Sequence, residues 1–184
     1  MRIYLREVTL DDGDMIVKWR NSPNVSKHCF NRKLITLESN KRFYEQFITT
    51  GRYLQFIVER VDEQYGVVSY PIATVYLKDI DRTNNRCEFC IFTSDDEEWN
   101  DESKSIAIKM LLEKAFSELK MNKVYSYVFV EFIDEADLLR QAGFSAEAIL
   151  YEEAVDSKGN YADVIRFSIT KAKYDYQSKA NKDF

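Results

Sequence analysis

One segment near the middle of the chain has the pattern of a helix that is buried along one side. Its apolar residues recur at the spacing i, i+3, i+4, i+7, i+8 and i+11, as Ile108, Leu111, Leu112, Ala115, Phe116 and Leu119. In an α-helix this spacing gathers the side chains into one stripe. The stripe therefore predicts a long helix whose apolar face is buried.

Runs of alternating, β-branched and aromatic residues predict strands on both sides of this helix. They cover residues 2–8, 53–61, 69–77 and 86–93 before it, and 123–130, 147–155 and 162–170 after it. Shorter helices are expected between the turn at 11–14 and Pro23, over 37–49 and over 134–141. This order predicts a mixed α/β fold in one domain, residues 1–170. We expect the polar tail, residues 171–184, to be loose.

The composition and charge argue against several classes of function. The formal net charge is −5 and no basic cluster stands out, whereas a nucleic-acid surface needs many Lys and Arg side chains. No apolar run approaches the ~20 residues that span a bilayer, and the first residues enter a strand pattern without a signal-peptide core. We therefore expect a cytoplasmic protein that binds neither nucleic acid nor membrane.

The three cysteines indicate no disulfide framework and no metal site. Their small, odd number fits a reducing compartment. Cys87 and Cys90 form a CxxC pair, but they lie in a predicted strand, where side chains three residues apart point to opposite faces. We expect no metal cofactor.

Several fragments resemble the GNAT superfamily of acyl-CoA-dependent N-acyltransferases. They are Ile3-Tyr4-Leu5-Arg6, Asp11-Asp12, Trp19-Arg20-Asn21, Leu77-Lys78-Asp79-Ile80-Asp81, Ala115-Phe116, Gly143-Phe144 and Gly159-Asn160-Tyr161-Ala162-Asp163-Val164-Ile165. The first fragments are similar to the branch that acetylates amino-sugar nucleotides. The last run is similar to the ending of ribosomal-protein and other N-terminal acetyltransferases. Together the fragments extend over nearly the whole chain.

The resemblance implies the GNAT fold, with a central mixed but mostly antiparallel sheet flanked by helices. It also implies acetyl transfer from acetyl-CoA to a primary amine. In that fold one strand diverges from its parallel neighbour, and the pantetheine arm enters the gap. The pyrophosphate lies where the long helix begins, because a helix N-terminus favours an anion. A base or a water relay deprotonates the acceptor amine, which is mostly ammonium at neutral pH.

Glu88 and His28 are the candidate catalytic residues. Glu88 lies in the predicted strand 86–93, where several GNAT enzymes have a general base; alternatively it faces solvent or pairs with Arg86. His28 is the only histidine and belongs to a segment that would cover the acceptor. An imidazole can act as a base near neutral pH, although a loop histidine is otherwise a polar surface residue.

The candidate cofactor residues depart from the family pattern. The backbone around Phe92 and Thr93 would hold the thioester and pantetheine. The phosphate loop, Gln/Arg-x-x-Gly-x-Gly/Ala in the family, corresponds to Asn100-Asp101-Glu102-Ser103-Lys104-Ser105, so Asn100, Ser103, Lys104 and Ser105 would hold the pyrophosphate. Both glycines are replaced by Ser. Residues 95–104 also contain six acidic residues and one Lys, a local charge of −5 that opposes a pyrophosphate.

The group that returns a proton to the leaving thiolate is altered as well. Many family members have a Tyr four residues before the Gly-Phe pair, and here that position is Leu139, which has no donor. The Asn that usually starts the same segment falls at Phe132. Tyr125, Tyr127 and Tyr151 are candidate substitutes, and the sequence does not choose among them.

Our first hypothesis is an N-acetyltransferase acting on a primary amine of a small molecule, with a nucleotide-linked amino sugar slightly favoured. Trp19, Arg20 and Asn21 would contact this acceptor, although Trp19 is alternatively a core anchor. Two other functions stay open. One is a GNAT-fold binding protein that has lost the cofactor, and the other is an acetyltransferase of protein N-termini. We expect a monomer or a homodimer.

Overall fold

A computed structural model describes residues 2–63, 68–92 and 94–180, and these residues form one seven-stranded sheet. Its strands are β1 (Ile3–Glu7), β2 (Leu54–Asp62), β3 (Val68–Asp81), β4 (Arg86–Phe92), β5 (Lys123–Phe129), β6 (Ser145–Val155) and β7 (Tyr161–Thr170). They lie in the order β1-β2-β3-β4-β5-β7-β6, and all neighbours are antiparallel except β4 and β5. The mixed α/β fold with a mostly antiparallel sheet is therefore confirmed.

The parallel pair β4 and β5 separates soon after it begins. In the described part of both strands, the register covers Arg86↔Lys123, Cys87↔Val124 and Glu88↔Tyr125. Beyond Glu88 the strands are no longer paired, so a gap opens between their C-terminal halves. A parallel pair needs a crossover connection, and a helix after β4 provides it. This divergence is the feature that the resemblance implied.

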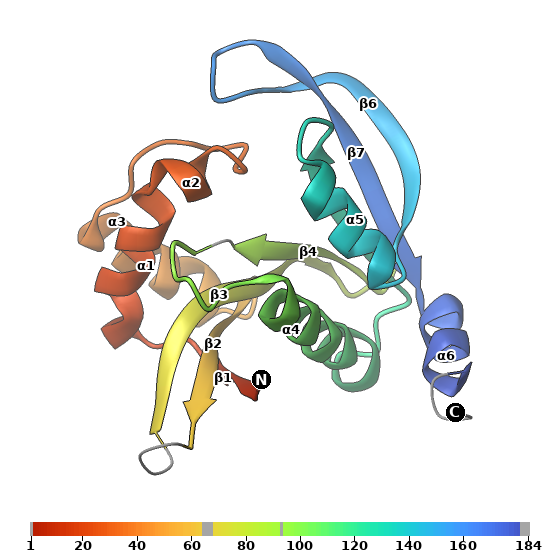
Figure 1. Cartoon of the computed structure of the whole chain (residues 1–184), viewed down its shortest axis with the longest axis horizontal. Helices are drawn as coiled ribbons and strands as arrows, with labels where there is room; N and C mark the ends of the chain where they lie inside the picture. Colours follow the sequence, from red (N-terminus) through yellow and green to blue (C-terminus); the bar gives the residue numbers. More distant parts are fainter. Residues whose placement is uncertain (1, 64–67, 93, 181–184) are drawn as a thin grey trace.

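Helices cover both faces of the sheet (Figure 1). They are η1 (Leu10–Asp12), α1 (Gly13–Asn21), α2 (Pro23–Ser26), α3 (Leu37–Phe43), η2 (Tyr44–Ile48), α4 (Asp101–Glu113), η3 (Lys114–Glu118), α5 (Ile133–Gln141) and α6 (Lys171–Ala180). On one face Ile16 of α1 packs against Ile57 of β2. On the other face Val58, the next residue of β2, belongs to the cluster that contains the α4 side chains. The alternation of β2 thus separates the two helical layers.

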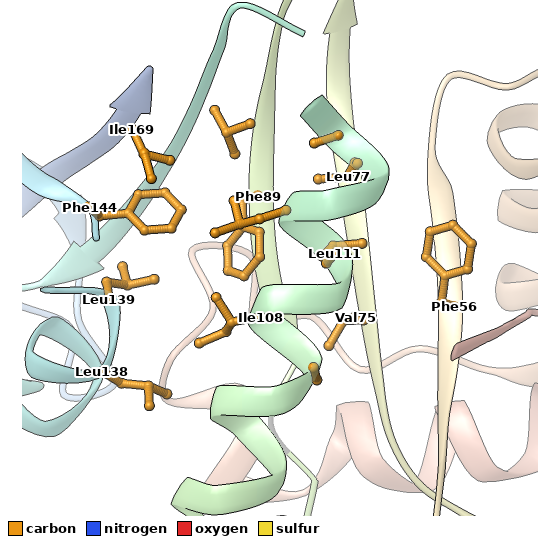
Figure 2. Close-up of a cluster of buried hydrophobic side chains, with 14 of the residues drawn as sticks. Phe56, Val75, Leu77, Phe89, Ile108, Leu111, Leu138, Leu139, Phe144 and Ile169 are labelled. Atoms are coloured by element: carbon orange, nitrogen blue, oxygen red, sulfur yellow. The ribbon is translucent and has the colours of Figure 1, made fainter. Parts of the chain in front are cut away.

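The predicted apolar stripe lies at the centre of the core (Figure 2). Ile108, Leu111, Leu112, Ala115 and Phe116 are each at most 2% exposed, whereas Leu119, the last residue of the stripe, is partly buried. Phe89 of β4 belongs to the same cluster and packs on Phe144 with 5.5 Å between ring centroids. The predicted helix is confirmed. The packing of Phe89 in this cluster fixes β4 against α4, next to the gap between β4 and β5.

The expectation of a loose tail is wrong for residues 171–180, which form α6. The ring of Tyr174 stacks on Phe116 with 4.7 Å between centroids, and Lys171 forms an ion pair with Asp175 one turn along the helix. This polar helix is thus held by an aromatic contact with the core and by hydrogen bonds such as that from Lys173 to the Ser145 hydroxyl at 2.7 Å. No helix in the described part of the chain is long and apolar enough to cross a membrane.

Candidate active site

A cavity of about 470 Å³ lies where β4 and β5 diverge. Its walls come from the sheet, from the segment α1–α3 and from α5. The lining residues with ionisable side chains include Arg20, His28, Lys78, Glu88 and Glu135, and the aromatic ones are Phe30, Phe43, Tyr53, Tyr76, Phe89 and Tyr127. The space between the diverging strands is thus open and not filled by the protein's own side chains. A concave, ring-lined site with a few convergent polar groups is the usual form of a small-molecule site.

Glu88 lies on the cavity face of β4 at the point of divergence. The residue is 8% exposed, and its Oε1 atom lies 2.9 Å from Nζ of Lys78, which is directly opposite on β3. Both alternatives from the sequence are wrong, because Glu88 does not face solvent and Arg86 pairs with Asp81 at 3.2 Å. The structure thus brings the predicted base to the cavity together with a cation.

The environment of Glu88 changes the proton affinity of its carboxyl. Burial raises its pKa above the ordinary value of a glutamate, and the Lys78 ammonium opposes that rise. Buried carboxyls with a specific charge partner in a cleft are frequent at catalytic sites, because proton transfer works best when the pKa of the base is near the working pH. The arrangement suits a general base.

His28 lies on the opposite wall of the cavity. Its Nδ1 atom is 3.0 Å from Oε1 of Glu135 on α5, an ion-pair distance without the alignment of a hydrogen bond. The imidazole packs on the ring of Phe132 with 4.0 Å between centroids. His28 thus connects the segment after α2 to α5 at the cavity. Its role as a base stays a prediction.

The three candidate acceptor residues on α1 have different surroundings. Arg20 lines the cavity, and its guanidinium donates to the carbonyl of Asn31. Trp19 is 6% exposed and packs with Val25, so it is the core anchor of the alternative interpretation. Asn21 holds the following loop, because its amide donates to the Ile35 carbonyl at 2.8 Å and accepts from the Ile35 N–H at 2.9 Å. Trp19 and Asn21 are therefore not among the cavity residues.

Backbone N–H groups at the start of α4 already have hydrogen-bond acceptors within the protein. The Asn100 side chain accepts from the N–H groups of Glu102 and Ser103 at 3.1 and 3.2 Å, and the Asn100 carbonyl accepts from Lys104 N–H at 2.9 Å. Ser103 is fully buried and donates its hydroxyl to the carbonyls of Glu98 and Asn100. A pyrophosphate would have to displace the Asn100 side chain. This geometry disfavours the cofactor role predicted for Ser103.

Of the remaining predicted cofactor residues, Lys104 lines a second, small hollow. The hollow, about 40 Å³, is lined by Ile91, Asp101, Lys104, Asp134, Glu135 and Leu138. Lys104 Nζ is 3.7 Å from Asp101, and Ser105 is half-buried in the first turns of α4. Phe92 ends β4 opposite Thr74, and Thr93 lies outside the described residues. Since Glu135 lines both spaces, this hollow adjoins the large cavity.

The three tyrosines that were predicted to replace the missing proton donor lie in different surroundings. Leu139 lines the cavity, so an apolar group does occupy that wall. Tyr127 also lines the cavity, whereas Tyr151 is 76% exposed. Tyr125 is 9% exposed, and burial raises its pKa to about 12. Tyr127 is thus the one of these three phenols that faces the site.

Comparison with known proteins assigns the chain to a family. A family profile described as "Acetyltransferase (GNAT) domain" matches residues 2–145. The chain belongs to the GNAT acetyltransferase family. As a GNAT protein with N-acetyltransferase relatives, it is an acetyl-transferring enzyme, and the predicted superfamily is confirmed.

The relatives of this GNAT chain extend over nearly its whole length. It is 29% identical over 181 residues to the uncharacterized N-acetyltransferase p20 of Bacillus licheniformis, covering 94% of this chain and 95% of that protein. It is 26% identical over 173 residues to spermidine N(1)-acetyltransferase of Vibrio cholerae, with coverage of 94% and 95%. A crystal structure of spermidine N-acetyltransferase from Vibrio cholerae in complex with CoA and spermine matches with a TM-score of 0.84 and 27% identity, covering 94% of this chain and 97% of that one.

Proposed function

We propose that this GNAT enzyme acetylates a terminal primary amine of a flexible aliphatic polyamine, with acetyl-CoA as donor and Glu88 as general base. The observation that carries the proposal is the buried Glu88 carboxylate beside an open, ring-lined cavity at the divergence of β4 and β5. The names of the Vibrio cholerae relatives, which include spermidine, support this class of acceptor.

The cavity walls suit a chain of methylene groups that ends in ammonium groups. Rings such as Phe43, Tyr53 and Tyr127 offer faces to methylene segments and to cations. Glu88 and Glu135 add carboxylates at the side where the strands separate. A polyamine would therefore find both apolar and anionic partners.

The same walls offer little to a nucleotide diphosphate. Recognition of a diphosphate needs cations with free donors. Lys78 is paired with Glu88, and Arg20 donates to the Asn31 carbonyl. The nucleotide-linked amino sugar has less support than a polyamine, and it stays a prediction.

The reaction can be assigned to residues of the site. The acceptor ammonium gives a proton to Glu88, directly or through water, and the neutral nitrogen attacks the thioester carbonyl. The carbon–sulfur bond then breaks, and CoA leaves as a thiolate or a thiol. The attacking nitrogen loses its second proton to water as the amide forms. Leu139 has no donor, so the sulfur takes a proton from Tyr127 or water, or CoA leaves as the thiolate.

An acceptor comparison tests the proposed function. The purified protein with acetyl-CoA should release CoA with spermidine or spermine at a kcat/KM at least about tenfold above that for a nucleotide-linked amino sugar or a peptide N-terminus. Mass spectrometry of the product should show one added acetyl group on a terminal nitrogen. Preference for the sugar or the peptide would replace the proposed acceptor. Absence of acetyl-CoA binding in a calorimetric titration would favour the binding-protein alternative.

A second prediction concerns the acidic residues at the start of α4. Asp101→Asn should tighten acetyl-CoA binding about two- to fivefold at low salt, because it removes a carboxylate near the expected pyrophosphate and frees Lys104. The gain should vanish near ~1 M salt, where the screening length is about 3 Å. Glu113→Gln is the matched control, since this exposed residue lies at the other end of α4, about 18 Å away. Equal gains in both variants, or a gain that persists at high salt, would contradict this account.

A further inference from the structure

Lys78 and Glu88 form a largely buried lysine–carboxylate contact that lines the cavity. The residues are directly opposite in the antiparallel pair β3–β4, and 25% and 11% of their side-chain surfaces are exposed. The thiol of Cys90 contacts the same carboxylate, with Sγ 3.4 Å from Oε1. Both neighbours therefore engage the same carboxylate oxygen, Oε1.

The backbone next to Lys78 is irregular. The register of β3 and β4 shifts between Lys78 and Asp81, and Asp79 has φ +49°, a left-handed conformation that is uncommon outside glycine. Bulges beside active sites redirect the side chains near them. This one lies immediately after the cation that touches the proposed base.

We propose that Lys78 is a positioning residue for acetyl transfer, which fixes Oε1 of Glu88, turns Oε2 toward the acceptor nitrogen and keeps the carboxylate charged. This inference rests on the proposed function of Glu88 as the base. Lys78 does not act as the base or the nucleophile. Although burial lowers its pKa, the neighbouring Cys90 and Glu88 more than offset that effect and raise the value, so the amine stays an ammonium.

The groups around Glu88 come from every wall of the cavity. They are Tyr53 just before β2, Tyr76, Lys78 and Asp79 on β3, Cys90 on β4, Tyr125 and Tyr127 on β5, Arg20 and His28 on the α1–α2 side, and Glu135 on α5. Among these groups Lys78 is the cation in contact with the carboxylate. Removing its charge should therefore raise the pKa of Glu88 further, because the effect of burial would no longer be opposed.

The test is the pH profile of Lys78→Met with spermidine and acetyl-CoA. We expect kcat to fall about 10- to 100-fold with little change in the KM for acetyl-CoA, since a misplaced base costs rate and not cofactor binding. The acidic limb of kcat/KM should move to higher pH. Lys78→Arg should keep the limb in place and restore most of the rate. Lys109→Met, an exposed lysine on α4, is the control and should match the wild type.

The inference is overturned if Lys78→Met loses rate while its acidic limb stays where it is in the wild type, because a structural role alone would give that result. If Lys78→Met does not fold, Lys78→Gln removes the charge, keeps a donor and gives the same test. Full activity of Glu88→Gln would overturn both this inference and the proposed base. An inactive Glu88→Gln together with an unmoved limb in the lysine variants would overturn the role of Lys78 alone.

Discussion

Replacing Glu88 by Gln should lower kcat/KM for the amine acceptor by about 10²- to 10⁴-fold, the usual contribution of a general base. The amide has nearly the same size as the carboxylate but cannot accept a proton from the ammonium. Binding of acetyl-CoA should be unaffected, because Glu88 is not among the residues at the start of α4. Steady-state kinetics together with a calorimetric titration of acetyl-CoA would measure both quantities.

The pH dependence gives a second test of the same residue. Because burial raises the pKa of Glu88, the wild-type rate should rise with pH through a limb above the ordinary value of 4.5, and the residual rate of Glu88→Gln should lack this limb. The sign for stability is opposite. A carboxyl whose folded-state pKa is raised contributes stability that is present below 4.5 and is lost as the pH rises through the folded-state value.

A matched control shows whether the effect is specific to Glu88 or follows the loss of any glutamate carboxylate. Glu153→Gln changes an exposed residue of β6 in the same way and should leave kcat/KM unchanged. If Glu88→Gln keeps more than about a tenth of the wild-type rate, another group removes the proton. His28 would then be the next residue to replace, because it faces the same cavity.

Phe89→Ala should lower the free energy of unfolding by about 3–5 kcal/mol. Phe89 is fully buried on the core face of β4, in the same cluster as Ile108 and Leu111 of α4 (Figure 2). Its loss would leave a cavity between the sheet and α4, which the surrounding side chains fill only in part. Urea unfolding followed by circular dichroism should show a lower midpoint with little change in slope.

Tyr151→Ala serves as the comparison for the loss of a ring. Tyr151 is 76% exposed on β6, so its removal should change the free energy of unfolding by about 0.5 kcal/mol or less. A small effect of Phe89→Ala would show that the core around α4 rearranges to fill the space. Because Phe89 follows Glu88 in β4, its replacement should also shift Glu88 and lower activity, even at temperatures at which all of the variant protein is folded.

The amino-acid sequence by itself determined the seven strands and the long central helix, although it did not predict α6. The stripe Ile108–Leu119 and the alternating strands depend on local periodicity, which a helix or a strand expresses wherever it lies. The GNAT resemblance followed from short fragments in the right order, and it placed Glu88 on the diverging strand. Lys78 could not have been found in this way, because a regular hairpin that pairs Asp81 with Arg86 sets Asp79 opposite Glu88. Only the register shift between Lys78 and Asp81 brings Lys78 to that position.

Only the tertiary structure decided which side chains serve the site. Asn21 and Trp19 look like acceptor contacts in sequence, yet their partners are Ile35 and a core cluster. The contact between His28 and Glu135 joins residues more than a hundred positions apart, and the ring of Tyr174 in α6 meets Phe116 in the core. Such pairings depend on packing between distant segments, and local sequence patterns do not encode them. Burial, which raises the pKa of Glu88, arises only when those segments meet.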